Sequence, residues 1–335
     1  MDFDLSPEQQ QLFDAITRWA EKDYGFEMRK KIMHSHSGHS EVAWQALAEL
    51  GVLALPIPSE YEGFDGTAVD QMVVMQALGR AMVIEPVLAT LLGVEFLKRA
   101  KGHGHLLSQV GSGEVKIACA LHERQSRHEL HNITLSATHK GDSWELNGEK
   151  VNVLHASQAD YLIVSARSSG HARDTAGISL FVVPLDSEGL SVRESRSNDG
   201  MRVATVHFKH VRVTADSLLA KEALGWDVLD AAADHGVSLL CSEALGVMDK
   251  QLAQHAYIAG DNYTIADIAC FPWTRSWKNQ GINWDDYPHA KRWHDEIAAR
   301  PAVQRGVEVL THLRKPLVDD KAREMMFGAT QYQKR

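Results

Sequence analysis

Apolar residues recur at helical spacing through the first third of the chain. Ser6 followed by Pro7 has the residue types of a helix N-cap and first helical position. Leu12, Ile16 and Trp19 then fall three or four residues apart, on one face of a helix. The same spacing predicts further helices over residues 42–50, 68–82 and 87–97.

The pattern changes after about residue 112. Short runs rich in β-branched and aromatic residues alternate with turn residues such as Asn147-Gly148, which is typical of a small antiparallel barrel or sandwich. Helical spacing returns near residue 223. We therefore predict a multidomain α+β fold with N-terminal helices, a middle β domain and an all-α C-terminal part. The predicted strands cover residues 115–121, 133–138, 143–146, 161–166, 178–183 and 205–208.

A seam at residues 239–252 separates two kinds of sequence. Leu240, Ala244, Val247, Met248 and Leu252 follow the spacing of one helix face, and the stretch contains no proline run or Gly/Ser tract. The seam is thus predicted to lie inside a helix rather than in a linker. The expected divisions are residues 1–112, 113–222, 223–248 and 249–335.

Composition limits the possible functions. The 335 residues carry a net charge of −9, which gives no basic surface for nucleic acid or an anionic membrane. The first residues lack the basic start and apolar run of a signal peptide, and no stretch approaches the roughly 18 apolar residues of a membrane helix. We expect a cytoplasmic protein with neither nucleic acid nor membrane as a partner.

The spacing of the cysteines and histidines predicts neither a metal site nor a disulfide framework. Cys119, Cys241 and Cys270 are far apart and have apolar neighbours, as buried thiols do. The histidines at 34–39 and 103–105 lie in polar segments, where solvated loop residues are more common than zinc ligands. We therefore predict no metal.

Several motifs in the first 248 residues carry a family resemblance. They are Met1-Asp-Phe-Asp-Leu-Ser-Pro-Glu-Gln9, Ala77-Leu-Gly-Arg80, Leu121-His-Glu-Arg-Gln-Ser-Arg127, Asn147-Gly-Glu-Lys-Val151 and Asp199-Gly-Met-Arg202. In this order they resemble the acyl-CoA dehydrogenase family, and most of all its pimeloyl-CoA dehydrogenase small-subunit group. The resemblance implies FAD-dependent α,β-dehydrogenation of an acyl-CoA, with a pimeloyl or other dicarboxylyl group as one candidate substrate.

The resemblance also implies the residues that face the flavin. His122 stands where family members often have threonine, and Leu154 replaces another frequent threonine. A plain structural interpretation, in which His122 and His155 are ordinary loop and strand-end histidines, stays open. Arg124 and Arg127 are candidates for CoA phosphates or solvated surface arginines. The cofactor-binding candidates are Leu121, His122, Glu123, Ser126, Leu154 and His155.

The sequence after residue 248 resembles a different family. Tyr263-Thr-Ile-Ala-Asp267 has the pattern of a capping box, with Thr264 as N-cap and Asp267 three residues later, which predicts a structural role for both. This box and Asp286-Tyr-Pro-His-Ala-Lys-Arg-Trp293 resemble the C-terminal domain of glutathione transferases. No thioredoxin-like domain that would activate glutathione precedes them in this sequence.

The resemblance leaves the catalytic base unassigned. A dehydrogenase of this family takes its base from the final helical bundle, most of which the transferase-like sequence replaces. Glu243 is the carboxylate nearest the seam, but its place on an ordinary helix gives it no catalytic assignment at this stage. The sequence thus predicts a dehydrogenase that is impaired as an isolated chain.

Two alternatives remain. One is a non-catalytic subunit that assembles with another acyl-CoA dehydrogenase subunit, as a homo- or hetero-oligomer. The other is a glutathione transferase relative without its thioredoxin-like domain. We also predict few contacts between residues 250–335 and the β domain at 113–222.

Overall fold

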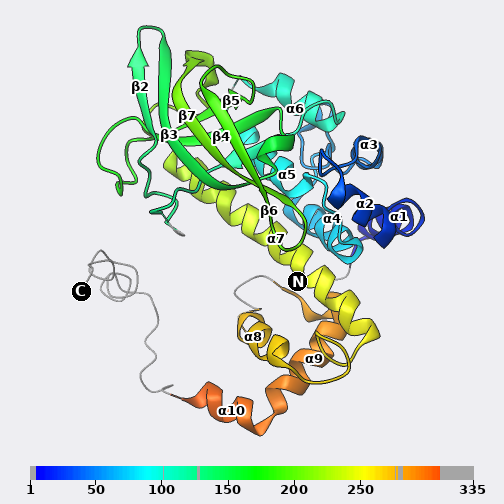
Figure 1. Cartoon of the computed structure of the whole chain (residues 1–335). Coiled ribbons are helices and arrows are strands. Elements are labelled where there is room, and N and C mark those ends of the chain that lie inside the picture. Colours follow the sequence, from blue (N-terminus) through cyan, green and yellow to red (C-terminus); the bar gives the residue numbers. More distant parts are fainter. Residues whose placement is uncertain (1–4, 101, 127–128, 276, 278–281, 310–335) are drawn as a thin grey trace.

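The computed structural model describes residues 5–100, 102–126, 129–275, 277 and 282–309. The start of the first family motif, Arg127 and the last residues of the transferase-like segment lie outside these ranges. Within them the predicted α+β class is confirmed, with N-terminal helices, a curled middle sheet and a helical C-terminal part (Figure 1). None of the described helices is both long and apolar enough to cross a membrane.

The N-terminal helices begin and end where local signals place them. Ser6 caps α1: its hydroxyl accepts the Gln9 N–H at 3.2 Å, and the Gln9 side chain accepts the Ser6 N–H at 2.9 Å. Trp44, Leu47 and Val74 then form a core between the helices. The elements are α1 (Pro7–Asp23), α2 (Phe26–His34), α3 (Glu41–Glu49), η1 (Ser59–Tyr61), α4 (Ala68–Ala81), α5 (Val87–Arg99) and α6 (Gly104–Gly111).

The middle region is a single seven-stranded sheet in the order β1-β4-β2-β3-β7-β6, with β5 paired to β4. Most pairs are antiparallel as predicted, but β1 and β2 each pair with β4 in parallel. Strand β6 was not predicted, because five of its seven side chains are exposed and it lacks a buried face. The strands are β1 (Ile117–Ala120), β2 (Ser136–Lys140), β3 (Ser143–Leu154), β4 (Tyr161–Arg167), β5 (Ile178–Pro184), β6 (Leu190–Arg196) and β7 (Arg202–Thr214); short 3-10 turns follow β3 (η2, Ala156–Gln158) and β7 (η3, Ala215–Ser217).

Helix α7 (Trp226–Gln254) joins all parts of the molecule (Figure 1). It contains the whole seam, so the prediction of a helix there is confirmed. It packs on α4 and α5. At the crossing with α4 the backbones touch: a Cβ at Gly79 would lie 2.1 Å from the Glu243 carbonyl oxygen, and one at Gly246 would lie 2.3 Å from the Gln76 carbonyl oxygen. Only glycine fits at either position.

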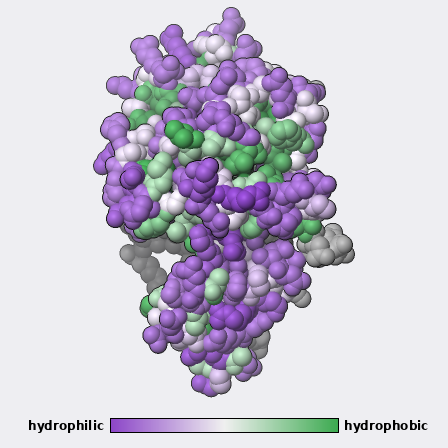
Figure 2. Space-filling view, turned by 90° about the vertical axis from the view of Figure 1, so that its right-hand side faces the viewer, coloured by the Kyte–Doolittle hydropathy of each residue, from purple (hydrophilic) through white to green (hydrophobic). Residues whose placement is uncertain are grey.

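The transferase-like helices form a small lobe on the second half of α7. They are α8 (Ile265–Thr274), η4 (Trp284–Asp286), α9 (Pro288–Ala299) and α10 (Pro301–Glu308). Trp293, Phe271 and Ile297 form their core together with Leu245 and Leu252 of α7, and this cluster includes no described residue of the β domain, as predicted. Figure 2 shows the lobe below a narrow waist, mostly hydrophilic on that face.

Asp249 links the lobe to the rest of the chain. Its carboxylate is fully buried, accepts a hydrogen bond from the Arg80 guanidinium at 2.9 Å, and accepts the backbone N–H groups of His289 and Ala290 at 2.9 and 3.0 Å. The last two lie at the start of α9, where a negative charge is favourable. One side chain thus holds α4, α7 and α9 together.

Thr264 and Asp267 make the reciprocal bonds of a capping box at the start of α8. The Asp267 carboxylate accepts the Thr264 N–H at 2.8 Å, and the Thr264 hydroxyl accepts the Ala266 N–H at 3.2 Å. Asp267 is also fully buried and accepts the indole N–H of Trp293 at 2.8 Å. Its bonds therefore fix α8 against α9.

Candidate active site

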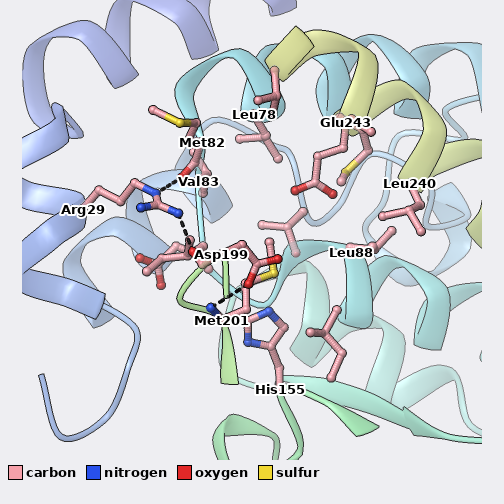
Figure 3. A pocket seen from close by; sticks show the side chains of 17 residues that line it. Arg29, Leu78, Met82, Val83, Leu88, His155, Asp199, Met201, Leu240 and Glu243 are labelled. Atoms are coloured by element: carbon pink, nitrogen blue, oxygen red, sulfur yellow. Dashed lines mark hydrogen bonds between the residues drawn. The ribbon is translucent and has the colours of Figure 1, made fainter. Parts of the chain in front are cut away.

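A cavity of about 340 Å³ lies where α4, α7 and the end of β3 meet (Figure 3). Its wall is largely apolar, with a few charged groups pointing in from different elements. Such a mixture is typical of a small-molecule site. The residues that matter for chemistry are Arg29 from α2, Glu85, Leu154 and His155 at the end of β3, Asp199, and Glu243 from α7.

Glu243 presents an unpartnered carboxyl oxygen to this cavity. The Oε2 atom is buried and has no hydrogen-bond partner among the described residues. Burial, and secondly the charge of Asp199, raises the pKa of this carboxyl to about 7. The side chain thus gains and loses a proton near neutral pH, as a general base must.

Glu85 is a second carboxyl at the cavity, with different surroundings. One of its oxygens accepts the Tyr24 hydroxyl at 3.0 Å, and the other accepts the Ser40 N–H at 3.0 Å. Burial raises the pKa of Glu85 to about 7 as well. Because both oxygens are occupied, Glu85 joins α1 to the start of α3, and Glu243 is the carboxyl that can accept a proton from a ligand.

His155 is a neutral imidazole at the cavity wall. Its backbone has φ 58°, which turns the chain at the end of β3. The Gln158 amide donates to the Ser37 carbonyl at 3.0 Å, so its oxygen accepts a hydrogen bond from His155 Nδ1. Burial lowers the pKa of His155 to about 4. The Nε2 atom is therefore left as an acceptor.

Arg29 and Asp199 lie together at the opposite side of the cavity from Glu243 (Figure 3). The Arg29 guanidinium donates to the Met82 carbonyl at 2.8 Å and to the Asp199 carbonyl at 2.6 Å. These bonds connect α2 with the end of α4 and with the turn before β7. The Asp199 carboxylate is itself held by the Met201 N–H at 3.1 Å.

The two predicted cofactor-facing segments lie side by side. The Val151 N–H donates to the His122 carbonyl at 2.8 Å, which ties β3 to the turn after β1. Leu154 and His155 line the cavity, but Leu121, His122, Glu123 and Ser126 do not. His122 is half-buried and Leu121 is buried.

Glu123 and Ser126 use their side chains inside the protein. The Ser126 hydroxyl accepts the Glu123 N–H at 2.9 Å and donates to the Glu123 carbonyl at 2.8 Å. The Glu123 carboxylate binds the Lys150 ammonium at 2.8 Å and the Thr134 N–H at 2.8 Å. These bonds shape the turn and hold both side chains within the protein.

Comparison with known families agrees with this architecture. Residues 6–101 match the acyl-CoA dehydrogenase N-terminal domain, and residues 118–211 match the acyl-CoA dehydrogenase middle domain. The chain carries the first two domains of an acyl-CoA dehydrogenase. Residues 241–301 match the glutathione S-transferase C-terminal domain. The dehydrogenase match ends at residue 211 in β7, and the transferase match begins inside α7, two residues before Glu243.

Individual relatives are similar to this chain in sequence, and solved structures are similar to it in fold. Mouse mitochondrial short-chain specific acyl-CoA dehydrogenase is 26% identical over 216 residues, covering 62% of this chain and 52% of the relative, so the chain spans about half of that protein. Butyryl-CoA dehydrogenase from Megasphaera elsdenii superposes with a TM-score of 0.71 at 19% identity, covering 94% of this chain and 82% of the other. A solved FAD-dependent dehydrogenase gives a TM-score of 0.68 at 22% identity, covering 88% and 80%.

The sequence predicted a cofactor-binding role for Leu154 and His155, which line the candidate site, but gave no role to Glu243. One signal was available: Glu243 is the single charged residue between His235 and Asp249. A lone carboxylate on an otherwise apolar helical stretch is uncommon unless it is paired or functional. Arg29 and Asp199 had no comparable signal, because they come from distant segments that only the fold brings together.

Proposed function

We propose that this chain catalyses FAD-dependent α,β-dehydrogenation of an acyl-CoA, with Glu243 as the base. The observation that carries the proposal is the buried, unpartnered Oε2 of Glu243 in a cavity bounded by Leu154 and His155. Under this proposal α7 supplies, from within the seam, the base that the sequence motifs leave unassigned.

The chemistry of Glu243 follows from its surroundings. As a carboxylate it removes the proton from Cα of the acyl thioester, and its raised pKa makes it a stronger base than a solvated glutamate. The apolar wall excludes water, which would otherwise compete for that carboxylate. Direct packing of α7 on α4 at Gly79 and Gly246 fixes the position of the carboxyl over the cavity.

The residues at the end of β3 fit a flat flavin ring. Leu154 offers an apolar surface, and the neutral His155 ring offers an acceptor without introducing a charge. FAD, when bound, supplies the acceptor for the hydride that leaves Cβ. Leu154 and His155, together with the backbone of the 121–126 turn, are the residues that would hold it.

The finer substrate assignment stays a prediction. A pimeloyl or other dicarboxylyl group needs a cation for its far carboxylate. Arg29 is a cation at the cavity, and two of its N–H groups already serve backbone carbonyls. Assembly with a second acyl-CoA dehydrogenase subunit, on which a non-catalytic role would depend, also stays a prediction.

A visible absorbance spectrum of the purified chain tests the proposed function. We expect a bound-flavin spectrum that bleaches anaerobically when butyryl-CoA or octanoyl-CoA is added. A flavin spectrum that bleaches only after a second dehydrogenase subunit is added would instead indicate a subunit role. A chain that takes up no added FAD would contradict the proposal.

The pH dependence of bleaching tests the role of Glu243. Because only the carboxylate accepts a proton, the rate should rise with pH until about pH 7. The charge of Asp199 contributes to the raised pKa of Glu243. Asp199→Asn should therefore move the rising limb of the pH–rate profile to lower pH. Asp186→Asn, at an exposed loop position, is the matched control. An unshifted limb in Asp199→Asn would contradict the assignment of that limb to Glu243.

A further inference from the structure

A second cavity adjoins the candidate active site along α7. It has a volume of about 530 Å³ and lies between α7 and the transferase-like lobe. Ala244 and Val247 line both this junction cavity and the active-site cavity. The two spaces therefore meet along one strip of the α7 surface, one helical turn beyond Glu243.

The junction cavity offers almost only apolar surface. Among the residues that the structure describes, its lining has no charged side chain. Its two side chains with amide or hydroxyl groups are already bonded within the protein: the Gln251 amide donates to the Ile258 carbonyl at 3.2 Å, and the Thr274 hydroxyl donates to the Phe271 carbonyl at 2.9 Å. A ligand group in this space would gain from burial and find no free polar partner among these two side chains.

Large apolar side chains are left in water along this path. Leu240 is 52% exposed, Val247 is 39% exposed and Trp273 is 78% exposed. Such a row beside a cavity indicates a surface that a ligand or partner covers. Because this row begins at the cavity where the reacting carbons would lie, a substrate that extends from that cavity would cover it.

From these observations we propose that the junction cavity receives the far end of a long, unbranched fatty acyl chain. The proposal rests on the proposed function and specifies its substrate class. The thioester end lies beside Glu243, and the tail passes over Ala244 and Val247 towards Cys241 and Trp273. The transferase-like segment thus supplies the far wall of the acyl site, through Ile258, Cys270, Trp273, Thr274 and Ile282.

The geometry of α7 sets the acyl chain length at which the tail reaches the junction cavity. Gln251 lies eight residues beyond Glu243, which is about 12 Å along a helix axis. A butyryl group ends beside Glu243, whereas a dodecanoyl group is long enough to pass Val247 into the junction cavity. Each methylene buried there should tighten binding about fourfold.

Calorimetric titration of the purified chain with butyryl-CoA, octanoyl-CoA and dodecanoyl-CoA, without an electron acceptor, tests this. Affinity should rise steadily with length. Two variants should remove the gain in affinity from octanoyl-CoA to dodecanoyl-CoA and leave the affinity for butyryl-CoA unchanged. Cys241→Trp fills the cavity, and Trp273→Asp places a charge on its exposed wall, where misfolding is not expected. Ile265→Asp, 81% exposed on the same helix but outside both cavities, is the matched control.

The outcomes separate this inference from the proposed function. Equal affinity for octanoyl-CoA and dodecanoyl-CoA, or a length dependence that persists in Trp273→Asp and Cys241→Trp, would overturn the tail site while butyryl-CoA still bleaches the flavin. Tighter binding of dodecanedioyl-CoA than of dodecanoyl-CoA would also overturn it, in favour of a dicarboxylyl substrate. Failure of butyryl-CoA both to bind and to bleach the flavin would instead reject the proposed function.

Discussion

Glu243→Gln should lower the rate of acyl-CoA dehydrogenation by about 10²–10⁴-fold, which is the contribution of a positioned general base. Glutamine keeps the shape of the side chain but cannot accept the proton from Cα. Flavin content and butyryl-CoA affinity should therefore change little. The measurement is the anaerobic rate of flavin bleaching, followed alongside the flavin spectrum.

Two further variants make this result specific. Asp234→Asn removes an exposed carboxylate from the same helix and should leave the rate unchanged. Glu85→Gln alters the other carboxyl at the cavity, whose two oxygens are bonded to Tyr24 and Ser40. If Glu85→Gln abolished bleaching and Glu243→Gln did not, Glu85 would be the base and our assignment would be wrong.

The same variant has a predictable effect on stability. The pKa of Glu243 is raised from 4.5 to about 7 on folding, so its contribution to stability is present below pH 4.5 and is lost as pH rises through 7. Glu243→Gln should thus unfold with a free energy higher by up to about 3 kcal/mol above pH 7, and show no such gain below pH 4.5. Gain of stability with loss of activity is expected where a functional group is kept in an unfavourable environment.

Lys150→Met should lower the free energy of unfolding by about 3–5 kcal/mol, as removal of one partner of a buried ion pair does. The Lys150 ammonium is fully buried, and besides Glu123 it donates to the Ser165 hydroxyl at 3.0 Å. Burial alone would raise the pKa of Glu123, but Lys150 and the surrounding hydrogen bonds lower it to about 2. Without Lys150 a buried carboxylate is left uncompensated. Urea titration of flavin-free protein measures the effect.

Two further variants separate the loss of the buried ion pair from the loss of a lysine as such. Lys209→Met removes an exposed lysine from the same sheet and should cost little. The double variant Glu123→Gln/Lys150→Met should recover part of the loss, because no unpaired charge remains. A Lys150→Met loss no larger than that of Lys209→Met would contradict the structural role of the pair. Because this pair ties β3 to the 121–126 turn, flavin content should fall together with stability.

More of the fold than of the candidate site could be predicted from the sequence, because most of the fold has local signals. The Ser6 capping box and the apolar spacing of 68–82 are local signals, and α1 and α4 appear there. Strand β6 has mostly exposed side chains and gives no such pattern, so it was missed. Glu243 was passed over because helical spacing shows that it shares a face with Leu240 and Val247 but does not show that this face borders a cavity. That information lies in the contact of Gly79 with α7.

The continuity of α7 limits how two ancestral sequences could have been joined. A helix advances 1.5 Å and about 100° with each residue. One residue more or fewer between Glu243 and Asp249 would turn the lobe through that angle, and Asp249 could no longer meet both Arg80 and the start of α9. A flexible linker accepts any number of residues. A recombination inside a helix succeeds only in the correct rotational phase, roughly once in each turn of 3.6 residues. At this seam, therefore, only joins that keep the helical phase would preserve the contacts of Asp249.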